Sequence, residues 1–347
     1  MPLLIRVLIV DDSAFARKVV REILSTSSLI EVVGAARDGE EALEMTAALK
    51  PDVVVCDLQM PKLGGVGFVR SQMKLRPLPI LILSAAAGEA EEVINALAAG
   101  AVDVVKKPSA LATDDLRAVR DELIEKIKAV ANAPSENLTR EVLPATLSPA
   151  EKGPAHSPRF RMVVLGISTG GPQALRHLMP LLPRDLPVPM AIVLHMPVGY
   201  TALYAEKLNE LCELEIKEAE EGDVLRAGRV LLARAGRHLA FRQNAAGTVV
   251  AHLPLHPLEK IHRPSVDVLF RSAADIFQEG VLAIVMTGMG DDGKEGAGWV
   301  KAQGGTVLTE AEKSCVIYGM PRSVAEAGLS DAAILLDNMA HAITSRL

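Results

Sequence analysis

Residues 161–173 read RMVVLGISTGGPQ, and the fold prediction starts from this stretch. The apolar run at residues 162–167 is typical of a buried parallel β-strand. It ends at Ser168-Thr169-Gly170-Gly171-Pro172, and a helical pattern begins at Gln173. A hydroxyl group thus stands at the carboxyl end of a strand, where open α/β sheets bind ligands and a helix N-terminus favours negative charge. Alone, such a loop is more typical of a phosphate- or nucleotide-binding loop than of a catalytic one.

Two later apolar runs also end in polar residues. Residues 190–194 run directly into His195, and residues 281–286 lead into TGMGDDG, which contains Asp291 and Asp292. If these strands are neighbours in one parallel sheet, a nucleophile, a base and an orienting acid meet at one edge. A serine hydroxyl needs a base near pH 7, and imidazole is the side chain that ordinarily titrates there. The three strand ends therefore predict an activated serine.

The residues around Ser168 limit the kinds of catalytic or binding site that it can belong to. The order Ser…His…Asp differs from that of the α/β-hydrolases, and no GxSxG elbow surrounds Ser168. Nucleotide binding is disfavoured because the region that should carry a ribose-binding acid reads LPRDLPVPM. Backbone amides in the loops of Thr169, Gly170, Met289 and Gly290 are the candidate donors for an oxyanion. Thr169 is also a candidate for supporting His195.

The rest of the second half predicts an α/β domain with an irregular edge. Four short strand-like pieces, separated by glycine-containing turns, look antiparallel and suggest a hairpin insertion or a sheet edge at residues 214–217, 229–233, 238–242 and 248–252. A helix follows HRPS, with Pro264 and Ser265 at its start, and the tail from residue 318 is expected to add helices. Four histidines lack the spacing of one helical metal site and are interpreted as structural or exposed: His238, His252, His256 and His262.

The first 130 residues alternate strand and helix patterns. Apolar runs lie at residues 5–10, 30–35, 53–56, 80–83 and 102–105, with amphipathic stretches between them at, for example, residues 15–24, 39–49 and 89–99. Five such units predict a five-stranded parallel sheet with helices on both faces.

Acidic residues, a serine and a lysine stand at the ends of these strands. Asp11 and Asp12 follow the first strand, Asp57 the third, Ser84 ends the fourth and Lys107 follows the fifth. Converging carboxylates repel one another unless a hard cation binds, and oxygen ligands with room for water suit Mg²⁺. Asp57 is then a candidate phosphoryl acceptor, with Lys107 offsetting the charge.

Length and composition limit the number of domains and the classes of protein to be considered. A chain of 347 residues exceeds one ordinary core, and we expect a first domain at residues 1–130, a Pro/Ser/Ala/Glu-rich flexible linker at 131–159 and a second domain at 160–347. The net charge of −6 argues against a general nucleic-acid binder. Three scattered cysteines suggest buried thiols in a reducing compartment. No apolar run is long enough to span a membrane, so we expect a cytoplasmic protein that is not membrane-inserted.

The motifs VDDSAFARK, CDLQMP, ILSAA and KKP resemble those of response-regulator receiver domains. The resemblance implies a flavodoxin-like fold, phosphorylation of Asp57 by a partner histidine kinase, and Mg²⁺ at Asp11, Asp12 and Asp57. Ser84 would bond the new phosphoryl group and Lys107 would pair with it. Receivers commonly carry an aromatic residue where this chain has Val104, so signalling is expected to run through Ser84 and residues 85–89.

The motifs GISTGGP, LHMP, RPSVDVLFRSAA, MTGMGDDG and VIYGMPRSV resemble the catalytic domain of the chemotaxis protein-glutamate methylesterase (CheB) family. The resemblance implies a doubly wound α/β catalytic domain that hydrolyses glutamate methyl esters on methyl-accepting chemoreceptors and deamidates certain glutamines, with no cofactor for the esterase reaction. Ser168 would be the nucleophile, His195 the base and Asp292, rather than Asp291, the acid.

With a receiver in front, the catalytic domain is expected to be inhibited until the receiver is phosphorylated. Two other readings of the residues remain: an output domain that only binds receptors, and a nucleotide-binding output domain that uses STGG as a phosphate cradle.

Overall fold

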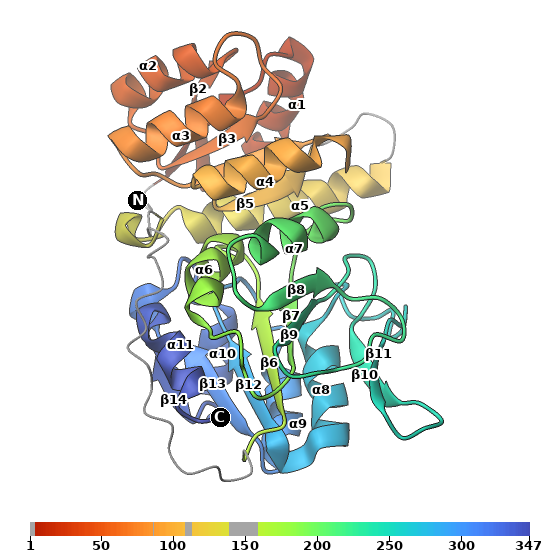
Figure 1. Ribbon diagram of the computed structural model, residues 1–347. Helices are drawn as coiled ribbons and strands as arrows, with labels where there is room; N and C mark the ends of the chain where they lie inside the picture. Colours follow the sequence, from red (N-terminus) through yellow and green to blue (C-terminus); the bar gives the residue numbers. More distant parts are fainter. Residues whose placement is uncertain (1–3, 86, 108–112, 139–158) are drawn as a thin grey trace. The chain divides into compact units, whose positions relative to one another are not determined.

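The computed structural model describes residues 4–85, 87–107, 113–138 and 159–347. The chain divides into two compact units between residues 140 and 141, called here the N-terminal and C-terminal units (Figure 1). Of the predicted linker, residues 139–158 lie outside the described residues, and Ser135–Asn137 form a short 3₁₀ helix. No helix in the described ranges is long and apolar enough to cross a membrane.

The N-terminal unit contains the predicted five-stranded parallel sheet, in the order β2-β1-β3-β4-β5. The strands are β1 (Ile5–Val10), β2 (Ile30–Ala36), β3 (Val53–Asp57), β4 (Ile80–Ser84) and β5 (Asp103–Lys106). The helices are α1 (Ala14–Ser25), α2 (Gly39–Leu49), α3 (Gly65–Leu75), α4 (Ala90–Ala99) and α5 (Thr113–Val130), with a 3₁₀ turn η1 (Ala87–Glu89). Helix α1 packs with α5, whereas α3 packs between α2 and α4.

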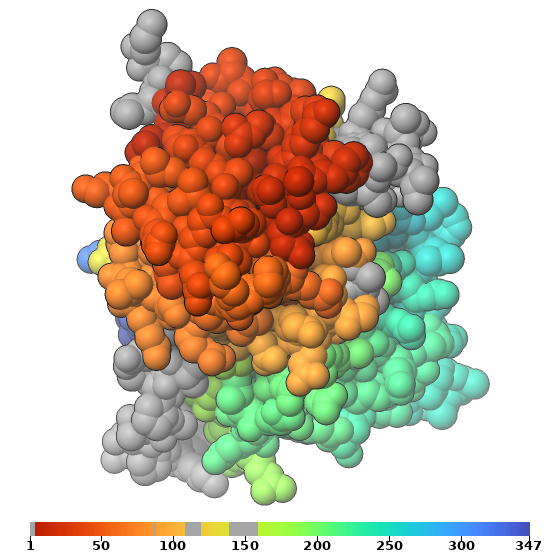
Figure 2. Space-filling view, turned by 90° about the horizontal axis from the view of Figure 1, so that it is seen from above, coloured from red at the N-terminus to blue at the C-terminus, as the bar shows by residue number. Residues whose placement is uncertain are grey.

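Because β3 and β4 are buried along their whole length, both faces of this sheet are covered. The predicted fold of this part is therefore confirmed. The space-filling view shows its red and orange residues as one continuous, closely packed surface (Figure 2).

The C-terminal unit is built on a seven-stranded sheet in the order β14-β13-β12-β6-β7-β9-β8, in which every pairing is parallel. Its strands are β6 (Met162–Ile167), β7 (Met190–Leu194), β8 (Glu215–Glu218), β9 (Arg229–Leu232), β12 (Val281–Val285), β13 (Thr306–Glu310) and β14 (Ala332–Ile334). Strands β10 (Ala240–Gln243) and β11 (Val249–His252) form a separate antiparallel pair. The predicted doubly wound, mostly parallel architecture with an antiparallel pair is confirmed.

The helices of this unit are α6 (Gly171–Leu178), α7 (Thr201–Asn209), α8 (Val266–Phe277), α9 (Lys294–Ala302), α10 (Met320–Glu326) and α11 (Leu336–Thr344), with 3₁₀ turns η3 (Met179–Leu181), η4 (Gln278–Gly280) and η5 (Glu312–Ser314). Helix α8 packs on β6 and β12 with an apolar face that includes Leu269, Phe270 and Ala273. Gly166 permits this packing, because a Cβ there would lie 2.2 Å from Val266. The start of α8 is thereby held against the centre of the sheet.

One sequence expectation for this unit was wrong, and another was incomplete. The pieces at residues 214–217 and 229–233 are not antiparallel: β8 and β9 pair in parallel and extend the main sheet beyond β7. The tail adds not only helices but also β14, a three-residue edge strand parallel to β13. Strands β8 and β14 are short and only partly buried, so their own residues do not specify which strand they will pair with.

Candidate functional site

The three strands predicted to carry the site are adjacent, because β6 lies between β12 and β7. Ile167 of β6 is in register with Leu194 of β7, and the next amide along, that of His195, donates to Ile167 O at 3.1 Å. On the other side, the Ser168 amide donates to Thr287 O, just after β12, at 3.0 Å. Ser168, 8% exposed, therefore stands at the sheet edge between the ends of both neighbouring strands.

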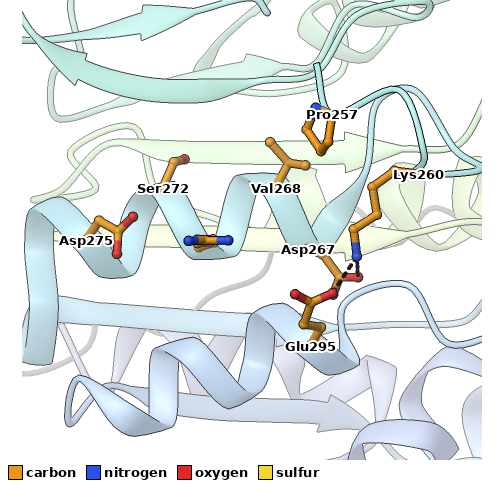
Figure 3. Close-up of a pocket in the computed structure, with 8 residues that line it drawn as sticks. Pro257, Lys260, Asp267, Val268, Ser272, Asp275 and Glu295 are labelled. Atoms are coloured by element: carbon orange, nitrogen blue, oxygen red, sulfur yellow. Dashed lines mark hydrogen bonds and ion pairs between the residues drawn. The ribbon is translucent and has the colours of Figure 1, made fainter. Parts of the chain in front are cut away.

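A surface pocket of the C-terminal unit lies over α8. It is lined by Pro257, Lys260, Asp267, Val268, Arg271, Ser272, Asp275 and Glu295 (Figure 3). Lys260 donates there to both Asp267, at 2.9 Å, and Glu295, at 2.6 Å. None of Ser168, His195 and Asp292 lines it, so the candidate site is defined by its side-chain contacts rather than by this pocket.

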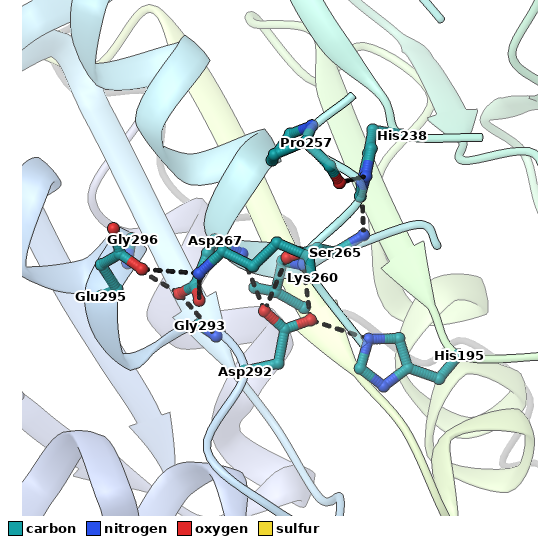
Figure 4. A network of polar contacts seen from close by, with 11 residues as sticks. His195, His238, Pro257, Lys260, Ser265, Asp267, Asp292, Gly293, Glu295 and Gly296 are labelled. Atoms are coloured by element: carbon teal, nitrogen blue, oxygen red, sulfur yellow. Dashed lines mark hydrogen bonds and ion pairs between the residues drawn. The ribbon is translucent and has the colours of Figure 1, made fainter. Parts of the chain in front are cut away.

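Asp292 contacts His195, whereas Asp291 is exposed. His195 Nε2 lies 2.9 Å from Asp292 Oδ2, and both side chains are about nine-tenths buried (Figure 4). An ionised carboxylate only accepts hydrogen bonds, so Nε2 carries the proton in this contact. Within the described residues, His195 Nδ1 is buried and has no hydrogen-bond partner. The unshared electron pair of the imidazole is therefore on Nδ1, the nitrogen available to act as a base.

The Asp292 carboxylate lies at the N-terminus of α8. It accepts hydrogen bonds from the Ser265 hydroxyl at 2.8 Å and from the amides of Val266 at 2.8 Å and Asp267 at 3.1 Å. Burial alone would raise the pKa of Asp292, but the His195 contact and these amides hold it well below its ordinary value. Asp292 is thus held as an anion. Ser265 occupies the predicted N-cap position, but its side chain makes no capping bond to its own helix.

The acids of the N-terminal unit also meet at a sheet edge. One oxygen from each of Asp11, Asp12 and Asp57 lies within 4.8 Å of the others. Lys107 Nζ lies 2.7 Å from Asp11 Oδ2 and donates to Asp57 Oδ2 at 3.0 Å. Asp11 Oδ2 is buried, and its contact with Lys107 is an ion pair that is not aligned as a hydrogen bond.

This cluster suits a hard divalent cation. All three ligands are carboxylates, and Asp12 is exposed, which leaves room for water on one side. Burial raises the pKa of Asp57 above its ordinary value; Lys107 only partly offsets the rise, and the nearby Asp11 adds to it. A bound Mg²⁺ would compensate the charge that these acids leave unbalanced.

Ser84, at the end of β4, lies next to this cluster in the sheet. Its hydroxyl donates to Glu89 Oε2 at 2.5 Å, and the Ala85 amide donates to the same oxygen at 3.0 Å. Glu89 is 9% exposed and lies at the start of α4. Val104 is buried in β5, opposite Ile82 of β4. Ser84 and Glu89, the two ends of the segment predicted to transmit the signal, are thus in direct side-chain contact.

Comparisons with known proteins assign both units. Residues 163–343 match the CheB methylesterase family, and residues 7–119 match the response regulator receiver domain. A Myxococcus xanthus relative named protein-glutamate methylesterase/protein-glutamine glutaminase 5 is 49% identical over 340 residues, 96% of this chain and 96% of that protein. A relative of the same name, without the number, from Halalkalibacterium halodurans is 43% identical over 98% of this chain and 97% of its own. The chain belongs to the CheB methylesterase family.

A solved structure agrees with the fold of the C-terminal unit. The crystal structure of the Thermotoga maritima CheB methylesterase catalytic domain superposes with a TM-score of 0.53 at 37% identity, and covers 54% of this chain and 99% of that one. The fold of the C-terminal unit thus agrees with the family assignment.

The loops around Ser168 in this CheB-family protein contain amides with no hydrogen-bond acceptor among the described residues: those of Gly170, Met289 and Gly290. The Met289 loop is held from behind, because the Gly319 and Met320 amides both donate to Gly288 O, at 3.1 and 2.8 Å. Gly319 must lack a side chain, since a Cβ there would lie 2.6 Å from Gly288 O. The predicted oxyanion donors therefore include three amides free to bind an anion.

One contact of His195 was missed by sequence reasoning. His262, interpreted as structural or exposed, stacks on His195 with ring centroids 4.1 Å apart and an angle of 18° between the planes. It lies in an irregular segment before α8, where no periodicity could reveal the contact; its position three residues before Ser265 was the only available signal. The other histidines are elsewhere: His238 is buried behind Ser265, and His252 pairs with Glu221 at the surface.

Proposed function

We propose that this protein is a phosphorylation-activated serine esterase of chemosensory two-component adaptation. It hydrolyses glutamate methyl esters, and deamidates specific glutamines, on methyl-accepting chemoreceptors. The observation that carries the proposal is the buried His195–Asp292 hydrogen bond, with His195 Nδ1 unpartnered among the described residues and Ser168 at the end of the neighbouring strand. The names of the relatives support the substrate class.

In the proposed reaction, Ser168 Oγ attacks the ester carbonyl carbon and its proton passes to His195 Nδ1. Asp292 stabilises the imidazolium that forms. The carbonyl oxygen becomes an oxyanion that the free amides of Gly170, Met289 or Gly290 can bind, each worth about 10²–10³ in rate. The methoxy group leaves as methanol with the proton from His195, and water, deprotonated by the same nitrogen, hydrolyses the acyl-enzyme. With a glutamine side chain, ammonia leaves instead.

Control comes from the N-terminal unit in this proposal. A partner histidine kinase supplies the phosphoryl group, and a carboxylate oxygen of Asp57 accepts it. Asp11, Asp12 and Asp57 would hold Mg²⁺, which would balance the charge on the phosphoryl oxygens. Lys107, already 3.0 Å from Asp57, pairs with the modified group, and Ser84 bonds to it. Phosphorylation adds roughly 1.5–2 negative charges.

The unphosphorylated receiver domain, residues 1–130, inhibits the catalytic domain, residues 160–347, across the linker at 131–159. The division of the chain into two compact units supports independent folding of the two parts.

The proposal is tested with receptor-containing membranes whose glutamate methyl esters carry a labelled methyl group. Purified protein is added with and without acetyl phosphate, and volatile labelled methanol is measured. The native chain should release methanol, faster with the phosphodonor, and Ser168→Ala should release none. Ser323→Ala is the matched control, because among the described residues the Ser323 hydroxyl bonds to Met320 O, within α10.

Methanol release that persists in Ser168→Ala would exclude Ser168 as the nucleophile. No release from the native chain, together with binding of the membranes, would favour an output domain that recruits receptors without catalysis.

A further inference from the structure

The N-terminus of α8 binds a carboxylate from another element in place of its own cap. A serine at the N-cap position ordinarily uses its oxygen to accept from an amide of the first turn. Ser265 does not: its hydroxyl donates to Asp292 Oδ1 at 2.8 Å. The first-turn amides donate to Asp292 as well. The cap of this helix is therefore the acid that contacts His195.

The four donors divide evenly between the two carboxylate oxygens. Oδ1 accepts from the Ser265 hydroxyl and the Asp267 amide, and Oδ2 accepts from the Val266 amide and contacts His195 Nε2. Donors on both oxygens fix the plane of the carboxylate as well as its position. Only Ser265 contributes a side chain to this set apart from His195, so it is the one donor that substitution can remove without changing the backbone.

Ser265 is itself held in place. It is 1% exposed, and its amide donates to His238 Nδ1 at 3.2 Å (Figure 4). His238 Nε2 in turn lies 3.0 Å from Pro257 O. The hydroxyl therefore points at Asp292 from a buried, anchored backbone.

Asp267, the other acid of this region, is engaged elsewhere. Its Oδ1 accepts from the amides of Gly293 and Gly296, at 2.9 and 2.8 Å, at the start of α9, and its Oδ2 accepts from Lys260 (Figures 3 and 4). The two helices thus exchange acids: Asp292, before α9, caps α8, and Asp267, in α8, caps α9. This exchange leaves Asp292 as the acid that Ser265 orients.

We infer that Ser265 is a positioning residue for the catalytic acid, an inference that rests on the proposed function. Its hydroxyl fixes the rotation of the Asp292 carboxylate, keeps the proton of His195 on Nε2 and leaves Nδ1 as the base toward Ser168. Its donated hydrogen bond also disperses part of the carboxylate charge. Without this bond the carboxylate attracts an imidazolium more strongly, so the base stays protonated up to a higher pH.

The test uses the full chain and a serine-reactive probe, phenylmethanesulfonyl fluoride, which needs no receptor. The labelling rate of Ser168 is followed by mass spectrometry between pH 5 and pH 9, for the native chain and for Ser265→Ala, Ser265→Thr and Ser272→Ala. In Ser265→Ala, labelling should slow about 10-fold, within the range that one hydrogen bond to a charged group supplies. The acidic limb of its pH profile should move to higher pH.

Ser265→Thr keeps the hydroxyl and should restore the limb. Ser272→Ala, in the middle of the same helix, should leave both rate and limb unchanged. An unchanged rate in Ser265→Ala, a slower rate with an unmoved limb, or failure of Ser265→Thr to restore the limb would each overturn the inference. Fluorescence of Trp299, the only tryptophan in the chain, reports whether each variant is folded.

Nitrogen chemical shifts of ¹⁵N-histidine-labelled protein give a readout independent of Ser168. The signal of His195, assigned with His195→Gln, should show the proton on Nε2 in the native chain and a mixture of the two neutral forms in Ser265→Ala. If neither the native chain nor any variant is labelled, but the His195 signal changes in Ser265→Ala, the proposed nucleophile is wrong and the role of Ser265 stands. If Ser168 of the native chain is labelled, but His195 has the same neutral form in the native chain and in Ser265→Ala, the role of Ser265 is wrong and the nucleophile stands.

Discussion

The two units place carboxylates at the same position in the same kind of sheet, yet the two edges differ in how these groups are satisfied. In the N-terminal unit, Asp57 ends β3 beside Asp11, and a single lysine serves both. In the C-terminal unit, Asp292 follows β12 and has a donor set of its own. The first edge has more negative charge than its partners balance, whereas at the second edge both oxygens of the carboxylate are hydrogen-bonded.

Because of this difference, the pKa values of Asp57 and Asp292 are shifted in opposite directions. Burial raises the pKa of Asp57, and the neighbouring Asp11 adds to the rise. Asp292 is also buried, but its hydrogen bonds hold its pKa well below the ordinary value. An under-compensated carboxylate is suited to bind a cation and accept a phosphoryl group, whereas a fully bonded one is suited to orient a base without reacting. The fold supplies the location, and the donors around each acid determine its role.

The largest effect expected from this comparison is on activity, when each acid is replaced by the isosteric amide. Asp292→Asn should lower kcat by about 10³–10⁴, because an asparagine in its place favours the wrong neutral form of the imidazole. Asp57→Asn should leave the rate without phosphodonor unchanged and abolish stimulation by acetyl phosphate. Methanol release from labelled receptor membranes measures both.

A loss of less than 10-fold in Asp292→Asn would mean that His195 does not depend on this acid. Stimulation by acetyl phosphate that survives in Asp57→Asn would place the phosphoryl group elsewhere. Asp291→Asn is the matched control, because Asp291 is adjacent but exposed.

A smaller effect is expected on stability, with opposite signs at the two edges. A raised pKa in the folded state means that Asp57 favours folding at low pH, and that this contribution is lost as the pH rises from about 4 through the raised value. At pH 7 and without Mg²⁺, Asp57→Asn should therefore raise the unfolding midpoint of the N-terminal unit by about 4 °C, which about 1 kcal/mol gives in a domain of this size. The gain should shrink as the pH falls toward 4.

For Asp292 the sign is reversed. Its lowered pKa stabilises the folded state above about pH 4, and the contribution is lost as the pH falls through the lowered value. Asp292→Asn should destabilise the C-terminal unit at pH 7. The two units can be followed separately, because Trp299 and all three tyrosines are in the C-terminal unit, whereas circular dichroism reports both. Shifts of the same sign in the two variants would contradict the comparison.

The sequence predicted the sheets well where strands are long and buried. The bounds of β1, β6 and β7 were predicted to the residue, because uninterrupted apolar runs define them. Strands β8 and β9 were found, but their direction was wrong. Glu215 and Lys217 of β8 give the alternating pattern of a half-exposed strand, which antiparallel pairs usually show, while its parallel pairing with β9 depends on distant packing.

The candidate site was predictable to the extent that its residues follow strands. Ser168 and His195 come directly after buried strands, and the joint placement of three polar strand ends, rather than either residue alone, indicated them. The contact that distinguishes Asp292 from Asp291 requires the start of α8, and the Ser265 donor looked like an ordinary helix cap. The stacking of His262 on His195 joins an irregular segment to a strand end, and no local pattern encodes such a contact.

The smallest expected effect is at the loop that joins the first edge to α4. The Ser84 hydroxyl donates to the carboxylate of Glu89, and it must leave that oxygen to bond a phosphoryl group on Asp57. Because a neutral amide oxygen accepts more weakly than a carboxylate, Glu89→Gln should release Ser84 more readily. The acetyl phosphate concentration that gives half-maximal stimulation should fall about 3-fold, within the difference between a charged and a neutral hydrogen bond, while the rate without phosphodonor stays the same. Glu91→Gln, exposed in the first turn of α4, is the control. An unchanged or higher half-stimulating concentration would show that Glu89 does not restrain Ser84, and that with Val104 in place of an aromatic residue the signal leaves this edge by another contact.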